Sequence, residues 1–72
     1  MNIIELITMT CSCSESEAQE HLDNEVRHLR ELRDLEAEGL AELEHRDYEY
    51  ACDNLGIEHD YIEYFMNQLM IA

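Results

Sequence analysis

Apolar residues recur every three or four positions along most of this chain, which is the spacing of one buried face of an α-helix. The pattern divides into four stretches, and none has the turn-bounded alternation of a β-strand. In the first stretch, Asn2 stands directly before the apolar run and Glu5 follows three residues later. That arrangement is typical of a capped helix start, so we predict a short helix that ends near Thr10.

The second stretch is the longest. Ser14 is placed as its N-cap and Glu17 at the capping-box position, and Gly39 is placed to end the helix in a left-handed conformation. The pattern predicts an amphipathic helix of more than about twenty residues. Its apolar stripe consists of Ala18, Leu22, Val26, Leu29, Leu32 and Leu35.

Two further helices follow. The third pattern begins at Leu40 and ends at Gly56, with Ile57 placed to fold back onto the helix end in a Schellman motif. The last helix is short and covers Tyr61 to Leu69, with a broad apolar face.

One continuous helix through Gly39 is the alternative, because no Ser, Thr, Asp or Asn caps a helix that begins at Leu40. Such a helix would be about 60 Å long and could hide its stripe only against another subunit. We favour a break, which gives an all-α fold: a small helical domain with a short N-terminal helix, a long helix hairpin broken near Gly39, and a short C-terminal helix. Either version leaves apolar surface, which predicts a homodimer. The predicted interface residues are Leu29, Leu32, Leu35, Leu40 and Leu43.

Length and cysteine content set the class of protein. Residues 1–72 make a single domain whose core is small. Three cysteines are an odd number, and Cys11 and Cys13 are too close in sequence for ordinary disulfide geometry. The chain therefore reads as a reduced, cytoplasmic protein. Its apolar start lacks a positive region and a cleavage site, so we expect neither a secretory signal nor membrane contact.

The net charge of the chain decides which partners can approach it. Eighteen Asp and Glu residues stand against four arginines and no lysine, which gives a formal net charge of −14. Such a negative field repels nucleic acids and anionic membranes and attracts basic protein surfaces. The functional interpretation is an acidic docking surface, and the alternative is a solvated, partly paired helix face. The candidate surface consists of Glu15, Glu17, Glu20, Asp53, Glu58, Asp60 and Glu63.

The arginines all lie between positions 27 and 46, among acidic residues. Opposite charges four residues apart stabilise a helix by about 0.2–0.5 kcal/mol per pair. Three such pairs are expected, namely Arg27–Glu31, Arg30–Asp34 and Glu42–Arg46.

Metal chemistry is a second hypothesis. Cysteine and histidine are the usual ligands of a structural zinc ion, but Cys52 falls among residues expected to pack in the core. The possible ligands are Cys11, Cys13 and Cys52 with His21 or His59. Two Glu-x-x-His pairs, Glu25/His28 and Glu42/His45, have the spacing of di-iron ligands but lie beside the apolar stripe. We expect exposed histidines whose pKa values are raised by nearby acids, and no metal or cofactor.

No nucleophile elbow or glycine-rich phosphate loop is present, so we expect a protein that is not an enzyme. Segment 51–62, ACDNLGIEHDYI, has the shape of a DNA-reading helix-turn-helix but carries no Lys or Arg to neutralise phosphates. Direct nucleic-acid binding is therefore not expected. A third hypothesis is that the acidic side chains imitate DNA and inhibit a nucleic-acid-binding protein.

Segments 11–32 (CSCSESEAQEHLDNEVRHLREL) and 51–62 resemble the small acidic helical proteins encoded in the exo–xis early region of lambdoid temperate phages. The resemblance implies an accessory protein in the cytoplasm of a host bacterium. Such a protein would affect phage development, including lysogeny, or host physiology by contacting host or phage proteins. The family supplies no site motif, so no functional residues follow from it.

Overall fold

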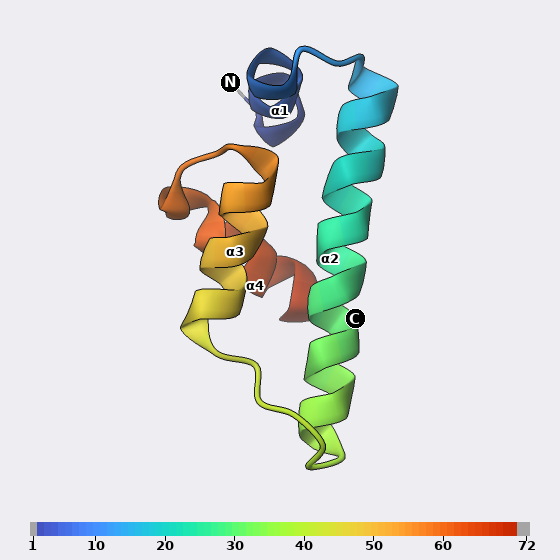
Figure 1. Cartoon of the computed structure of the whole chain (residues 1–72), viewed down its shortest axis with the longest axis vertical. Helices are drawn as coiled ribbons and strands as arrows, with labels where there is room; N and C mark the ends of the chain where they lie inside the picture. Colours follow the sequence, from blue (N-terminus) through green and yellow to red (C-terminus); the bar gives the residue numbers. More distant parts are fainter. Residues whose placement is uncertain (1, 71–72) are drawn as a thin grey trace.

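The computed structural model describes residues 2–70, and these residues form an all-α fold of four helices with no strand among them. A single-turn 3-10 helix, η1, leads into the last of the four (Figure 1). Within these residues no helix is long and apolar enough to cross a membrane. The elements are α1 (Ile3–Cys11), α2 (Glu15–Ala37), α3 (His45–Leu55), η1 (His59–Tyr61) and α4 (Ile62–Met70).

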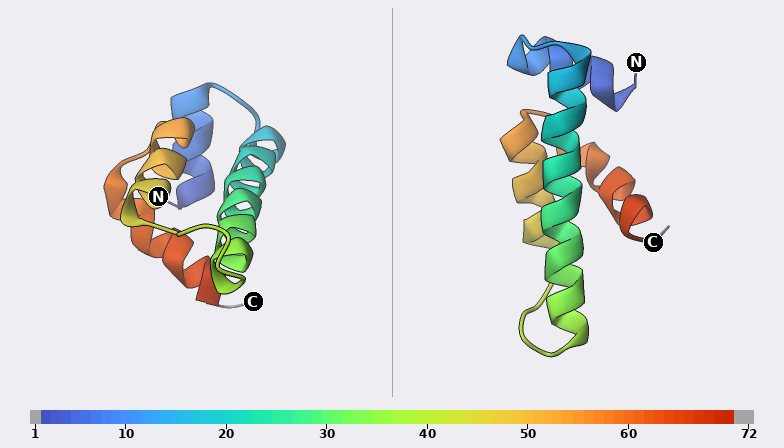
Figure 2. Two further views of the ribbon diagram at one scale, coloured as in Figure 1. Left: turned by 60° about the horizontal axis from the view of Figure 1, so that its bottom comes forward. Right: turned by 90° about the vertical axis from the view of Figure 1, so that its right-hand side faces the viewer.

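Helix α2 is the longest helix of the described residues. It has 23 residues and runs along the longest dimension of the molecule, which is 38 Å. Helices α1, α3 and α4 all contact α2, and α3 and α4 also contact each other. The views in Figures 1 and 2 show α1 beside the N-terminal end of α2 and the other two helices beside its middle.

Both predicted N-caps are confirmed. The Asn2 side chain accepts a hydrogen bond from the Glu5 backbone N–H at 2.8 Å, and Ser14 Oγ accepts one from the Glu17 N–H at 3.2 Å. Each bond satisfies one of the N–H groups that a helix start leaves without a partner. Helix α1 ends at Cys11, one residue later than predicted, and Ser12 follows in the left-handed region with φ of 53°.

The chain breaks near Gly39, and a continuous helix through this residue is excluded. Helix α2 ends at Ala37, and Gly39 has a φ of +76°. The N–H of Leu40 donates to the Leu35 carbonyl at 2.9 Å, and the Gly39 N–H donates to the Glu36 carbonyl at 3.0 Å. These two bonds form a Schellman motif, so the glycine ends the helix as its backbone freedom allows.

The start predicted for the next helix is wrong. Helix α3 begins at His45, and Leu40 lies in the connecting segment instead. The Glu36 carboxylate accepts a hydrogen bond from the Leu43 N–H at 2.8 Å, which ties this segment back to α2. Asp47 accepts from the N–H of Glu44, the residue before α3, at 2.8 Å. The Asp47 side chain therefore provides a hydrogen bond at the start of α3, whereas no capping residue is available for a helix that begins at Leu40.

The second glycine turn follows the prediction. Gly56 has a φ of +70°, the Ile57 N–H donates to the Cys52 carbonyl at 3.0 Å, and the Ile57 side chain is buried. The turn reverses the chain so that α4 can pack against α3. Because η1 takes up Tyr61, α4 begins one residue later than expected.

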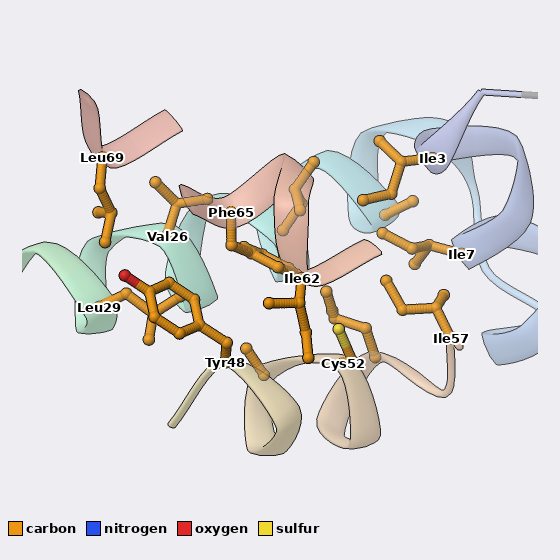
Figure 3. Packing of buried hydrophobic residues seen from close by; sticks show 14 residues of the cluster. Ile3, Ile7, Val26, Leu29, Tyr48, Cys52, Ile57, Ile62, Phe65 and Leu69 are labelled. Atoms are coloured by element: carbon orange, nitrogen blue, oxygen red, sulfur yellow. The ribbon is translucent and has the colours of Figure 1, made fainter. Parts of the chain in front are cut away.

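The core draws on all four helices (Figure 3). Phe65 of α4 lies near the middle of the cluster, and Ile3 and Ile7 of α1 lie at one end of it near Ile57. No buried polar or charged residue is found among residues 2–70. The buried residues are Ile3, Ile7, Ala18, Leu22, Val26, Leu29, Tyr48, Ala51, Cys52, Leu55, Ile57, Ile62, Phe65 and Leu69.

Candidate functional site

The leucines predicted as a dimer interface do not form one surface. Leu29 is only 1% exposed and lies in the core of the single chain, so it offers nothing to a partner in this fold. Leu43 packs against the core from the connecting segment, and Leu32 is half-buried. Leu35 and Leu40 are the remaining exposed members, at 38% and 71%. The prediction failed for Leu29 because α3 and α4 cover the same stripe of α2 that was assigned to a second subunit.

The predicted i,i+4 ion pairs of the arginines are also absent within the described residues. Arg30 instead donates to the Gln68 carbonyl at 3.3 Å, and Arg33 donates to the Leu69 carbonyl. Both acceptors lie in the last turn of α4, whose carbonyls have no partner within the helix and carry partial negative charge. Two arginines of α2 therefore cap the C-terminal end of α4, which sequence spacing does not reveal.

Arg27 lines a shallow groove between α2 and α4. No ion pair joins it to any carboxylate in residues 2–70, although the chain carries eighteen acids. Leu22 and Val26 form the apolar floor of the groove, and Tyr64 stands on the α4 side. An arginine without an internal partner is a candidate for contact with another molecule.

All seven acidic residues predicted as a docking surface are exposed. They fall into two groups. Glu15, Glu17 and Glu20 lie at the start of α2, where the first two complement the positive end of the helix dipole. The second group, here called the acidic corner, lies where α3 turns through η1 into α4 and consists of Asp53, Glu58, Asp60 and Glu63.

One basic side chain enters the acidic corner. His59 Nε2 lies 2.9 Å from Asp53 Oδ1, and both side chains are largely exposed. The hydrogen bond with Asp53 is the largest effect and raises the pKa of His59; desolvation opposes it, and the charges of Asp53 and Glu49 add to the increase. His59 therefore shows the effect that nearby acids were expected to have on a histidine.

We expect Asp53→Asn to lower the pKa of His59, because it removes the charge that favours the imidazolium form. A raised folded-state pKa gives stability that is fully present below the unfolded pKa and is lost as pH rises through the folded one. NMR titration of the His59 ring proton measures the shift directly. Asp60→Asn is the control, since no hydrogen bond joins it to His59; an equal shift in both variants would assign the effect to general charge instead.

The cysteines do not converge on a metal site. Cys52 is fully buried, and desolvation raises the pKa of its thiol to about 11. Cys11 is exposed and its thiol lies 3.8 Å from the Leu55 carbonyl oxygen, while Cys13 is half-buried with a pKa raised chiefly by desolvation. Within residues 2–70, no three His, Cys, Asp or Glu side chains are grouped as metal ligands. Neither Glu25/His28 nor Glu42/His45 belongs to such a group.

Comparison with protein-family models, with characterised proteins and with solved structures gives no match to this chain. The charge of the molecule and the side chains that its helices leave exposed are therefore the features that bear on its function.

Proposed function

We propose that this chain is a small acidic accessory protein that acts by binding a partner protein with a basic surface. The observation that carries the proposal is the use of the arginines. Arg30 and Arg33 donate to carbonyls at the end of α4, and their one ion pair in the described residues joins Arg33 to Asp34 at 3.6 Å, so they leave both predicted acidic groups without an arginine partner. No charged residue among residues 2–70 is buried, so the net charge of −14 faces solvent, where it attracts and orients cationic surfaces.

The acidic corner is the better docking surface of the two acidic groups. At the start of α2, Glu15 and Glu17 already have a structural role, because they stabilise the helix dipole. Asp53, by contrast, lies in the last turn of α3, where the dipole disfavours negative charge. The corner brings carboxylates from α3, η1 and α4 together around one turn, so a basic peptide could contact several of them at once.

The resemblance to accessory proteins of temperate phages supports a setting for this interaction. In that setting the partner is a host or phage protein in the bacterial cytoplasm, and binding alters phage development or host physiology. The activity is binding, with no catalytic step.

Capture from a bacterial lysate tests the proposal with three variants of equal charge change. In the corner variant Glu58, Asp60 and Glu63 become their amides, and in the helix-start variant Glu15, Glu17 and Glu20 become Gln. The control neutralises Glu31, Glu38 and Glu42, which are exposed and lie outside both groups. We expect only the corner variant to lose most of the captured protein, and wild-type capture to weaken steeply between about 50 and 500 mM salt.

Equal capture by the corner variant and the control would contradict docking at the corner. Capture that does not change with salt would contradict the electrostatic basis altogether. If the captured protein binds nucleic acid and duplex DNA displaces it, the chain acts as a DNA mimic, and the partner is of that class.

A further inference from the structure

One polar stripe of α2 remains uncovered by the rest of the molecule. Its members follow one another at alternating spacings of four and three residues, so they lie on one face of the helix. Each of them is exposed, and the right-hand view of Figure 2 shows α2 standing in front of the other helices with nothing drawn over it. The charged stripe consists of Ser16, Glu20, Asp23, Arg27, Arg30 and Asp34.

The order of charges along this stripe is self-complementary. Read from its start, the stripe is neutral, negative, negative, positive, positive and negative. If a second α2 lies antiparallel across a two-fold axis near position 25, Asp23 meets Arg27 and Glu20 meets Arg30, each twice. Ser16 meets Asp34, so no like charges within the stripe face each other. A two-fold interface requires this kind of self-complementarity, because the same patch serves on both subunits.

We propose that the charged stripe of α2 binds a second copy of this chain in an antiparallel two-fold arrangement. Arg27 then gains the carboxylate partner that it lacks within residues 2–70. Arg30 can join in while capping α4, since a guanidinium has five N–H donors and only one contact is made to Gln68. The dimer forms on a different face from the predicted leucine interface. Its formation does not depend on the basic partner protein proposed above.

Contact area comes from the groove beside the stripe. Arg27 and Arg30 line this groove together with Tyr64, above an apolar floor of Leu22 and Val26. The aliphatic stems of the arginines and the tyrosine ring supply the surface to be covered, while the ion pairs fix the register. Two chains of net charge −14 repel each other, so we expect a weak dimer.

Sedimentation velocity on the full chain at about 150 mM salt and up to about 1 mM protein tests this inference. We expect wild-type chains to associate reversibly, and Arg27→Asp and Asp23→Arg each to raise the dissociation constant about tenfold or more. Both positions are exposed, so circular dichroism should show folded variants. The decisive sample is an equimolar mixture of the two variants. Arg27→Asp carries acids at both 23 and 27, and Asp23→Arg carries arginines at both positions, so the two variants should form a heterodimer.

Glu42→Arg is the matched control, because it makes the same charge change as Asp23→Arg at an exposed site outside the stripe. It should dimerise at least as well as wild type, since it also lowers the net repulsion. A wild-type chain that stays monomeric at about 1 mM would overturn the inference. So would a dimer that persists in both stripe variants, which would place the contact elsewhere, or a mixture that stays monomeric.

Discussion

Phe65→Ala should lower the free energy of unfolding by about 3–5 kcal/mol, the cost typical of emptying an aromatic site in a core. The Phe65 side chain has no exposed surface, and its ring makes an edge-to-face contact with Tyr64 at a centroid distance of 5.6 Å. A domain of this size holds only a few kcal/mol in total, so most molecules of the variant should be unfolded. Urea denaturation followed by circular dichroism at 222 nm measures the loss.

Met66→Ala is the matched control, since the side chain is next in sequence and 38% exposed. We expect it to cost about 1 kcal/mol or less, because little buried contact is removed. A similar loss in both variants would mean that α4 contributes through its helix propensity and not through the packing of Phe65.

Gly56→Ala should be the second most damaging change, at about 2–3 kcal/mol. The residue has a φ of +70°, where a Cβ costs about 1–2 kcal/mol by itself. In addition, a Cβ placed there would overlap with Thr10 Cγ2, so the Thr10 side chain, α1 or the turn must move. Thermal or urea unfolding of the variant gives the loss.

Gly39→Ala separates the cost of a side chain at positive φ from the cost of the contact with Thr10. Its φ of +76° is similar, but nothing lies within 4 Å of the position that a Cβ would take, so only the conformational cost of about 1–2 kcal/mol should appear. Adding Thr10→Ser to Gly56→Ala removes the clashing methyl group and should recover the difference, since the hydroxyl that donates to the Leu6 carbonyl is kept. Equal losses at both glycines would rule out the contact with α1.

Local signals in the sequence predicted the ends of most helices correctly. Asn2 and Ser14 cap because their side chains accept from N–H groups three residues ahead, which needs no other part of the chain. The same is true of Gly39 and Gly56, which end helices because glycine tolerates a positive φ. The start of α3 was missed because its cap uses Glu44 and Asp47, and glutamate is not among the residues preferred at that position.

Among the candidate residues, exposure was predicted correctly for the seven acids, where it follows from charge. The seven acidic residues are exposed because an unpaired carboxylate is too costly to bury. Leu29 was misplaced because α3 and α4, which cover its stripe, are far away in sequence, and Arg30 and Arg33 were misplaced because they donate to carbonyls at the end of α4. Spacing along one helix shows which side chains share a face, but it does not show what covers that face.

The helices, most of their ends and the strong negative charge can be predicted from the sequence, because they depend on neighbouring residues and on composition. The packing of the helices is needed to see how α3 and α4 cover the leucine stripe, and that Arg30 and Arg33 cap α4 while Arg27 pairs with no carboxylate in the described chain. The physical reason is that burial and hydrogen bonding between helices depend on how the chain reverses at its two glycine turns, which local spacing does not encode.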